Sequence, residues 1–257
     1  KGESGGNKKN RDSADTLDAE DFNTSFIICG QDAVLDILGR RLEETAEQIS
    51  VLRKQVGSFA GLSALYHRKG HVTSAHLWAG DLDEYNTPYV RRLLPGHNLL
   101  VFNLVYRMAG FYVKKGNPKE ITDWADLRKG GIRFVNREKG SGARVLVAEK
   151  LKQLQIDYRQ IIGYGREEPS HLAIASSVAR GDADVGVGTE KAAKQVDGLD
   201  FVPLQKERYD LIMRKEELEQ PIFRLLIKII QSQEFKKEVE GMGHYDVTDM
   251  GKIMAEI

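Results

Sequence analysis

Short apolar runs alternate along this chain with segments whose apolar residues recur every three or four positions. The first apolar run is 25-SFIIC-29, and residues 32–46 follow it with helical spacing. The apolar face of that segment comprises Val34, Leu35, Leu38 and Leu42. We therefore predict a strand over 25–29 and a helix over 32–46, with Asp32 as the N-cap of the helix.

The same alternation continues through the first third of the chain. A strand over 49–56 precedes a helix over 57–70, for which we predict Ser58 as N-cap and Gly70 as terminator. A further strand covers 72–78. Strand–helix repeats of this length predict a parallel sheet with right-handed crossovers.

The second part of the chain repeats this pattern after a long apolar stretch. Residues 98–118 are rich in β-forming residues, and we predict that they form two extended passes. The predicted helices cover 122–130, the segment from Gly142 to about Leu154, 169–181 and the rest of the chain from Gln220 onward. The predicted strands cover 132–135, 183–188, 199–204 and 208–213. In the helix over 169–181, we expect Pro169 in the first turn and Gly181 at the end.

This order of elements predicts an α/β protein of two Rossmann-like lobes, the second inserted in the first. We place lobe 1 at residues 25–105 and 210–257, and lobe 2 at 106–209. The lobes are joined by a two-stranded hinge, formed by extended passes near residues 104–112 and 205–210. A length of 257 residues suffices for two lobes of ordinary size.

Residues 1–24 have the composition of a flexible linker or tail. They are rich in Gly, Ser, Asn and charged residues and contain almost no apolar side chain. Because the sequence begins at Lys1 without a methionine, we expect that a further segment precedes it in the gene. That segment could be a signal or lipid anchor, or another domain.

Composition limits the kinds of partner. Lys and Arg total 38, as do Asp and Glu, so no net charge attracts the chain to nucleic acid or to a membrane. Hydrophobic residues make up 41% and charged residues 30%, and no apolar run approaches the length of a membrane-spanning helix. The single cysteine, Cys29, lies in an apolar run, which excludes an internal disulfide and favours a buried thiol.

Four strand-to-helix corners carry candidate binding groups. In a parallel sheet, ligands gather at the carboxyl ends of strands, where the next helix presents unpaired amides and about half a positive charge. The corners are Gly30–Gln31–Asp32, Gly57–Ser58–Phe59, Gly140–Ser141–Gly142 and Pro169–Ser170–His171. Several such corners in a two-lobed chain favour a binding site for a small anion.

The third of these corners has the most specific chemistry. Gly140 and Gly142 allow the backbone to approach a ligand closely, and Ser141 can donate its hydroxyl. Arg137 and Arg144 can make paired hydrogen bonds to an oxyanion. The alternative is that Gly140 only turns the chain and Ser141 only caps the helix.

Motifs for other kinds of site are incomplete. Neither a Walker motif nor a dinucleotide fingerprint is present, so we predict no nucleotide cofactor. His67, His71 and His76 are close in sequence, but they do not form an H-E-x-x-H motif. We therefore predict no metal, and we assign His76 and His171 to hydrogen bonds with a ligand, or else to packing. No nucleophile–base pair is recognisable, so we predict that the chain is not an enzyme.

Four blocks of sequence resemble the periplasmic-binding-protein-like domain, a relative of type II solute-binding proteins of the molybdate-binding sort. The blocks are 76-HLWAGDLDEYNTPYVRRLLPG-96, 132-IRFVNREKGSGARVL-146, 166-REEPSHLAIASSVARGDADVGVG-188 and 208-RYDLI-212. The resemblance covers the chain from about Phe26 to Ile253 and implies a small ligand clamped between two hinged lobes. The residues that it implies toward the cleft are Gln31, Ser58, His76, Tyr85, Asn86, Arg137, Ser141, Arg144, Ser170, His171 and Glu190, and the glycine corner adds Gly142 to these.

Domains of this kind occur fused to helix-turn-helix regulators and to molybdopterin-biosynthesis proteins. The resemblance therefore implies a cytoplasmic sensor domain of a transcriptional regulator, which binds molybdate, tungstate or a molybdopterin-related compound without itself contacting nucleic acid. One alternative is an exported, lipid-anchored solute-binding protein that delivers an oxyanion to the permease of an ABC-type transporter. Another is a domain of a molybdopterin-biosynthesis enzyme.

Overall fold

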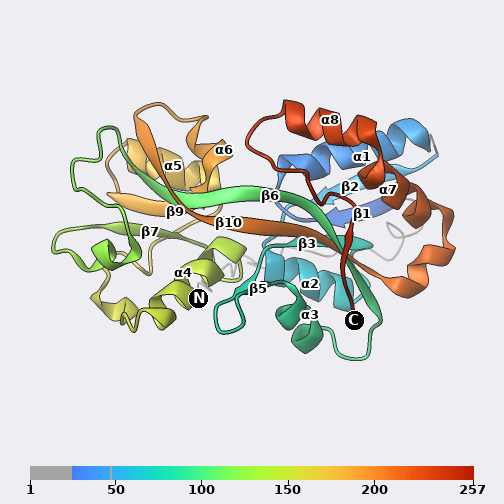
Figure 1. The fold of residues 1–257 in the computed structure, drawn as a ribbon, viewed down its shortest axis with the longest axis horizontal. Coiled ribbons are helices and arrows are strands. Elements are labelled where there is room, and N and C mark those ends of the chain that lie inside the picture. The colour runs from blue at the N-terminus through green and yellow to red at the C-terminus, as the bar shows by residue number, and fades with distance from the viewer. Residues whose placement is uncertain (1–24, 47) are drawn as a thin grey trace, which may run out of the picture.

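The computed structural model of this protein describes residues 25–46 and 48–257. In this part of the chain, nine strands form one mixed sheet that extends through both lobes (Figure 1). The strand order is β2 (Ser50–Lys54), β1 (Ser25–Cys29), β3 (Val72–Ala75), β10 (Leu199–Arg214), β6 (Leu99–Lys114), β9 (Val185–Thr189), β7 (Phe134–Arg137) and β8 (Glu167–Glu168), and β11 (Ile253–Glu256) pairs with β6. The tail predicted over 1–24 lies outside the described residues.

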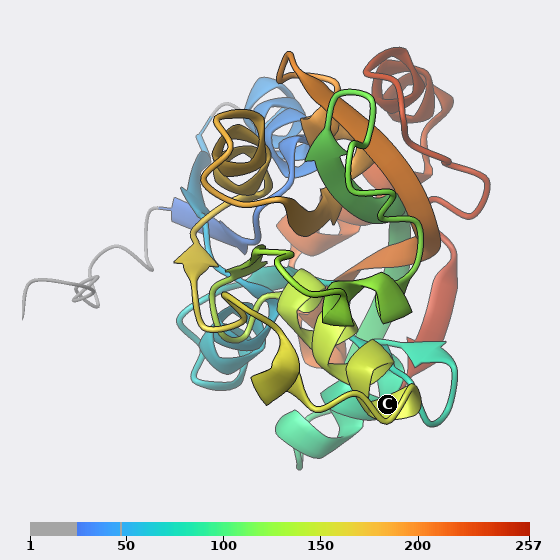
Figure 2. The same ribbon diagram turned by 90° about the vertical axis from the view of Figure 1, so that its left-hand side faces the viewer.

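Two long antiparallel strands join the lobes. β6 and β10 have 16 residues each, pair over nearly their whole length and lie side by side in both ribbon views (Figures 1 and 2). The predicted two-stranded hinge is therefore confirmed. The predicted division of 98–118 into two passes is wrong, because Gly110 lies within β6, where a side chain would meet the Val202 carbonyl. The division of 199–213 into two strands is also wrong, because a register shift next to Pro203 keeps β10 continuous.

Lobe 1 contains β1, β2 and β3 in parallel, as the strand–helix repeats predicted. Helices α1 (Ala33–Thr45), α7 (Pro221–Gln231) and α8 (Gln233–Gly241) lie on one side of the sheet, and α2 (Ser58–Tyr66) and α3 (Thr87–Leu93) lie on the other (Figure 1). Its largest apolar cluster includes Phe26, Leu35, Leu38, Phe223 and Leu226. The prediction of helix from Gln220 to the end is wrong, because the chain returns to the sheet as β11.

Lobe 2 is built in the same way around β7, which pairs in parallel with β8 and β9. Helix α4 (Gly142–Gln153) lies on one side of these strands, and α5 (His171–Ala179) and α6 (Glu190–Ala193) lie on the other (Figure 1). Its core includes Phe111, Phe134, Leu146, Val147 and Val185. Short 3-10 helices cover Trp124–Arg128, within the helix predicted over 122–130, and also Tyr158–Gln160 and Lys215–Glu219.

A small hairpin extends from the lobe 1 strands onto lobe 2. It consists of β4 (Trp78–Ala79) and β5 (Glu84–Tyr85). The strand predicted over 72–78 is therefore too long: β3 ends at Ala75, and Trp78 belongs to the hairpin. The Trp78 side chain is buried in the core of lobe 2. Gln153 of α4 donates a hydrogen bond from Nε2 to the Gly80 carbonyl at 2.6 Å. The residue limits of the two lobes stay a prediction.

The N-cap predicted at Asp32 is confirmed, Ser141 caps its helix as the alternative for that corner stated, and the cap at Ser170 was not predicted. Asp32, Ser141 and Ser170 are the N-caps of α1, α4 and α5, and each accepts a backbone N–H with its side-chain oxygen. The N-cap predicted for α2 is wrong. Gly57 occupies that position and Ser58 is the first helical residue, so its hydroxyl is not used as a cap.

Two further predictions about helix ends are wrong. Helix α2 ends at Tyr66, and Arg68 adopts a positive φ of 58° before Gly70 is reached. Gly70 is instead required by packing, because a Cβ there would lie 2.9 Å from the Cys29 sulfur. Pro169 precedes the N-cap Ser170 and lies outside the first turn of α5.

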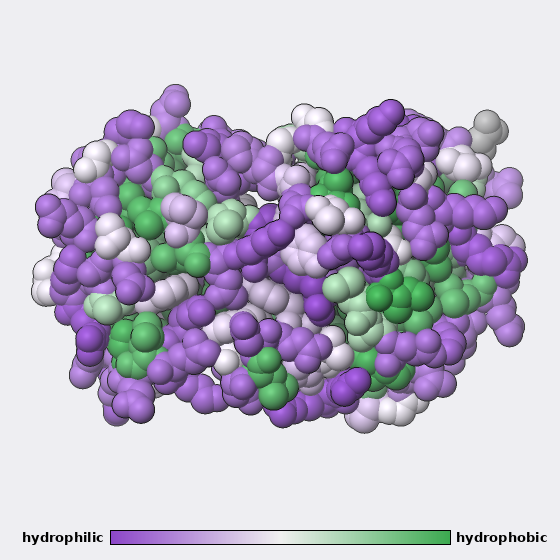
Figure 3. Space-filling model, viewed as in Figure 1, coloured by the Kyte–Doolittle hydropathy of each residue, from purple (hydrophilic) through white to green (hydrophobic). Residues whose placement is uncertain are grey.

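The hydropathy of the surface differs between the lobes and the region that joins them. In the view of Figure 3, hydrophilic residues cover most of the waist between the lobes, and apolar residues gather over each lobe. None of the helices in the described ranges has both the length and the apolar composition that crossing a bilayer requires.

Candidate functional site

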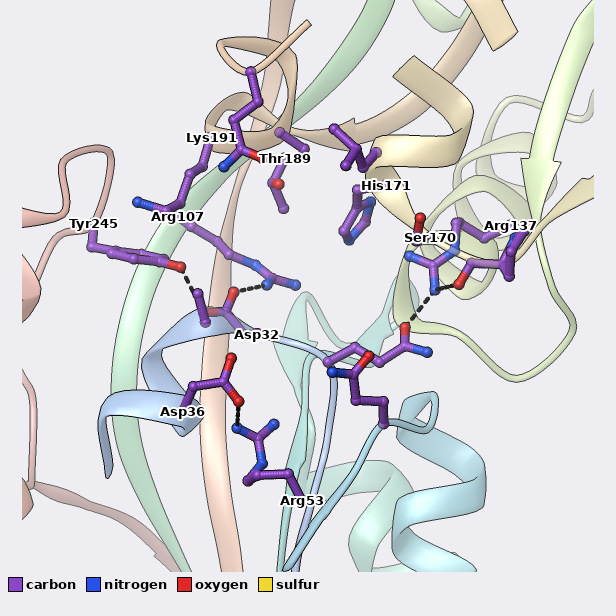
Figure 4. A pocket seen from close by; sticks show the side chains of 17 residues that line it. Asp32, Asp36, Arg53, Arg107, Arg137, Ser170, His171, Thr189, Lys191 and Tyr245 are labelled. Carbon is purple, nitrogen blue, oxygen red and sulfur yellow. Dashed lines mark hydrogen bonds and ion pairs between the residues drawn. The ribbon is translucent and has the colours of Figure 1, made fainter. Parts of the chain in front are cut away.

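A cavity of about 260 Å³ lies between the lobes beside the hinge strands. Figure 4 shows side chains from both lobes directed into it. Its polar lining includes Gln31, Asp32, Arg53, Arg107, Arg137, Ser170, His171, Thr189, Lys191 and Tyr245. We call this cavity the outer chamber.

A second cavity of about 10 Å³ adjoins the first and shares Gln31, Arg137 and His171 with it. Its other polar lining residues are Ser58, Ser74, His76, Ser141 and Tyr209. We call it the inner chamber, and the two chambers together the cleft. Ser58 of lobe 1 and Ser141 of lobe 2 therefore face a common space.

Four helices, α1, α2, α4 and α5, begin at the cleft. Because their first-turn amides lack helical partners, the N-terminal ends concentrate positive charge there. At α2 the Phe59 amide donates a hydrogen bond to the Gly140 carbonyl at 3.1 Å, which joins the two lobes directly. The lobes are thus in contact beside the inner chamber, as in a closed clamp.

Arg137 lies where the two chambers meet. Its guanidinium makes two 2.7 Å hydrogen bonds to the carboxylate of Glu138, which balances its charge. Its Nη2 also donates to Gln31 Oε1 at 2.6 Å and to the Pro169 carbonyl at 3.1 Å. Because Gln31 belongs to lobe 1, Arg137 is a second direct link between the lobes.

Arg107 extends from β6 into the cavity, between Asp32 and His171 in Figure 4. Its side chain is only 3% exposed, and it donates from Nε to Glu207 at 2.9 Å and from Nη1 to Asp32 at 2.5 Å. Its third nitrogen, Nη2, is buried without a hydrogen-bond partner among the described residues. Burial raises the pKa of Glu207, and the adjacent Arg107 opposes that rise.

The two cleft histidines are held in the neutral form. Burial, reinforced by the positive charges of Arg107 and Arg137, lowers the pKa of both His76 and His171 well below its usual value. Within the described ranges, His76 Nε2 and His171 Nδ1 are buried and have no hydrogen-bond partner. Gly142 makes room for His76, because a Cβ at this position would lie 2.3 Å from the imidazole ring.

The segment after α8, residues 242–245, borders the outer chamber, and we call it the strap. The Lys191 ammonium of lobe 2 donates to the Met242 carbonyl at 2.6 Å and lies 4.9 Å from the centre of the Tyr245 ring. The Tyr245 hydroxyl donates to Asp32 Oδ1 at 2.6 Å, and Asp32 in turn accepts from Arg107. The strap therefore connects lobe 2 to the residues that hold Arg107.

The structure brings many of the predicted site residues together. The residues that line the cleft are Gln31, Ser58, His76, Arg137, Ser141, Ser170 and His171, and Gly142 packs against His76. The other predicted residues lie elsewhere. Arg144 lines a separate surface pocket of lobe 2, where it contacts Glu167 and the Tyr164 ring. Glu190 pairs with His244 at 3.5 Å, outside the lining of either chamber.

Tyr85 and Asn86 support the hinge. The Tyr85 hydroxyl accepts from Gln205 at 2.7 Å, and Arg208 donates to its carbonyl at 2.6 Å. Asn86 is fully buried and binds Asp210 through its amide nitrogen at 2.8 Å. These contacts hold the 78–85 hairpin against β10 and away from the cleft.

Sequence reasoning missed several lining residues, above all Arg107, Tyr209, Lys191 and Tyr245. One signal could have indicated Arg107, because it is a lone cation in the apolar run 99–113, at the predicted hinge. Tyr245 has no such signal, since only the tertiary fold brings it to the N-terminal end of α1. The described residues contain no cluster of three or more His, Cys, Asp and Glu side chains that could hold a metal ion.

Comparisons with known proteins identify the family and the fold of this chain. The model of the PBP superfamily domain matches residues 39–231. YvgK, an uncharacterized protein of Bacillus subtilis (strain 168), is 39% identical over 236 residues, which cover 92% of this chain and 75% of YvgK.

Solved structures with the same fold are more distant in sequence. A substrate-binding protein from Clostridium perfringens with bound phosphate aligns with a TM-score of 0.65 and 17% identity, over 86% of this chain and 98% of that one. The tungstate ABC transporter from Geobacter sulfurreducens aligns with a TM-score of 0.63 and 15% identity, over 85% of this chain and 99% of that one. A histidine kinase sensor domain with similarity to periplasmic binding proteins aligns with a TM-score of 0.60 and 14% identity, over 86% of this chain and 97% of that one. These likenesses confirm the predicted fold.

Proposed function

Because the chain belongs to the PBP superfamily and has the type II periplasmic-binding-protein fold, we propose that it binds a small anionic ligand in the cleft between its lobes. The observation that carries this proposal is a set of three buried nitrogens that lack partners among the described residues. They are Arg107 Nη2, His76 Nε2 and His171 Nδ1.

Buried donors without partners cost free energy, so native proteins rarely retain them unless a ligand or ordered water completes them. Arg107 Nη2 can only donate, and a neutral imidazole can donate from the nitrogen that carries its proton. The N-terminal ends of four helices add partial positive charge around the same space. This combination suits the oxygens of an anion.

The ligand that we propose is a molybdate- or tungstate-like oxyanion or a molybdopterin-related compound. Two observations support an oxyanion. Proteins of the same fold were crystallised with phosphate or are described as tungstate transporters, and serine hydroxyls with helix amides can hold such an anion without a full counter-charge. We propose that binding is not followed by chemistry, so that ligand release returns the same compound.

We propose further that the chain is the sensor domain of a transcriptional regulator in the cytoplasm, where closure on the ligand biases an attached DNA-binding domain. The likeness to a histidine kinase sensor domain supports a signalling role for this fold. The alternative is an exported, lipid-anchored receptor of an ABC-type transporter, which the transport-protein likenesses favour. The sequence of the gene upstream of Lys1 distinguishes the two roles. A helix-turn-helix there would support the sensor, and a signal sequence with a lipidated cysteine would support the transport receptor.

Thermal unfolding in the presence of molybdate, tungstate, sulfate and phosphate tests the binding proposal. A ligand at about 100 times its Kd stabilises the folded state by about 2.7 kcal/mol, which is a readily measured rise in melting temperature. The His171→Ala variant should lose that rise, whereas His67→Ala, which changes an exposed histidine outside the cleft, should keep it. If none of the four anions changes the melting temperature of the wild type, the oxyanion proposal is wrong.

A further inference from the structure

The two chambers of the cleft differ in size in a way that bears on the class of ligand. The inner chamber, about 10 Å³, has room for roughly one water-sized group. The outer chamber, about 260 Å³, is many times larger by the same measure. A bare oxyanion with one oxygen in the inner chamber would therefore leave much of the outer chamber to solvent.

The unpartnered nitrogens are also divided between the chambers. His76 lines only the inner chamber, Arg53 and Arg107 line only the outer chamber, and His171 lines both. In addition to the three nitrogens named above, Arg53 Nε is buried without a partner in the described part of the chain. A ligand that extends through both chambers could complete all four, whereas a compact anion could complete only those near it.

Two arginines that line the outer chamber are already paired with carboxylates, and Lys191, which also lines it, donates to the carbonyls of the strap. Arg53 is paired with the Asp36 carboxylate, and Arg107 is paired with Asp32 and Glu207. Because these cations are already neutralised, their remaining N–H groups suit an uncharged acceptor such as a hydroxyl or a carbonyl. The amide side chains of Gln55 and Gln195 line the same chamber and can bind such groups.

Building on the proposed anion-binding function, we propose that the ligand is an organic ester of a tetrahedral oxyanion with an uncharged, polar body. One oxygen of the oxyanion enters the inner chamber, against Ser58, Ser141 and the two histidines, and the rest of the oxyanion lies where the two chambers meet. The body lies in the outer chamber, where its oxygens accept from Arg53 Nε and Arg107 Nη2. Arg53 is thus a specificity-determining residue for the body and makes no contact with the oxyanion.

Titration calorimetry with three phosphates tests this inference on the wild-type chain. The probes are inorganic phosphate, phenyl phosphate, which has an apolar body, and ribose 5-phosphate, which has a hydroxylated one. We expect ribose 5-phosphate to bind at least about tenfold more tightly than either of the others. If it binds no more tightly than inorganic phosphate, the extended-ligand inference is wrong, although the anion-binding function stands. If none of the anions binds, including molybdate and tungstate, both proposals fail.

The Arg53→Lys variant tests whether the uncharged body of the ligand binds in the outer chamber. Lysine keeps the positive charge beside Asp36 but has no atom equivalent to Nε, so we expect the affinity for ribose 5-phosphate to fall about five- to tenfold. The affinity for inorganic phosphate should not change. The matched control is Arg159→Lys, at a side chain that is 78% exposed in lobe 2, and it should leave both affinities unchanged. Equal losses for the two phosphates in Arg53→Lys, or no loss for either, would overturn the inference.

Discussion

The backbone amide of Phe59 in lobe 1 donates a hydrogen bond to the carbonyl of Gly140 in lobe 2. This bond joins the first turn of α2 to the corner that precedes α4, and Ser58 and Ser141 lie on either side of it. The two corners meet so closely that a Cβ at Gly57 would lie 3.2 Å from the Gly140 carbonyl oxygen. A ligand in the inner chamber is therefore enclosed by both lobes, which is the condition for ligand binding to favour closure.

The two serines of this junction should respond differently to removal of the hydroxyl. Ser141 accepts the Arg144 amide as N-cap, so Ser141→Ala should lower the free energy of unfolding by about 1 kcal/mol. Ser58 is buried but caps no helix, and its hydroxyl makes only long contacts with His76, at 3.4 Å to the amide and 3.5 Å to Nδ1, so Ser58→Ala should cost less stability than Ser141→Ala. Both variants should bind the oxyanion more weakly. Urea unfolding and calorimetry measure the two effects separately, and an equal loss of stability in both variants would contradict the capping assignment.

Gly142 should be required for the position of His76. In Gly142→Ala the new methyl group would meet the imidazole ring at 2.3 Å, and the ring must move. We expect stability to fall by about 1–3 kcal/mol and anion affinity to fall at least tenfold. Gly130→Ala is the matched control, because a Cβ at Gly130 meets no atom within 4 Å. A Gly142→Ala variant that binds as tightly as Gly130→Ala would show that His76 does not contribute to the site.

The parts of the site that sequence predicted are those with local signals. Asp32 was recognised as a cap, and Ser141 and Ser170 as residues of strand-to-helix corners, from a few neighbouring residues in each case. Arg107 and Tyr245 were missed because tertiary contacts bring them to the cleft. Both bind Asp32, from which Arg107 is separated by 75 residues in sequence and Tyr245 by 213. The hinge strands were divided wrongly for a related reason, since only pairing with β10 shows that Gly110 continues the strand.

Arg107 should be required for folding as well as for binding. Its removal in Arg107→Met leaves the Glu207 and Asp32 carboxylates without their common partner, and breaking a buried ion pair in this way costs about 3–5 kcal/mol. Adding Glu207→Gln should restore part of that loss, because a neutral amide replaces the uncompensated charge. The exposed Arg159→Gln should change the free energy of unfolding by less than about 1 kcal/mol. Chemical denaturation measures all three variants.

The neutral histidines predict how stability depends on pH. The pKa values of His76 and His171 are lowered in the folded state. Below about pH 6.5 these two histidines are therefore protonated in the unfolded chain while they remain neutral in the folded chain. Their contribution to stability therefore falls as pH decreases from 6.5 toward the folded-state pKa values. Between pH 7.5 and pH 5.5 we expect the wild type to lose on the order of 1 kcal/mol more per histidine than a His76→Gln/His171→Gln double variant.

Urea unfolding of both proteins at the two pH values measures this difference, and His67→Gln, at an exposed position, serves as control. A double variant that loses as much stability as the wild type would contradict the neutral assignment.

The strap should control how fast the ligand leaves. The Lys191 ammonium binds the Met242 carbonyl at 2.6 Å and the Gly243 carbonyl at 3.5 Å, so it ties lobe 2 to the strap beside the outer chamber. Lys191→Met removes these bonds and therefore favours the open state, in which a ligand touches only one lobe. We expect the dissociation rate to rise about five- to tenfold, with a smaller change in the association rate.

Stopped-flow measurement with a bound oxyanion gives both rates, and Lys194→Met, at an exposed position just after α6, provides the comparison for loss of one positive charge. If the two variants release the ligand at the same rate, the contact between Lys191 and the strap does not hold the lobes closed. Closure must then depend on the Phe59–Gly140 and Arg137–Gln31 hydrogen bonds, on the other side of the cleft.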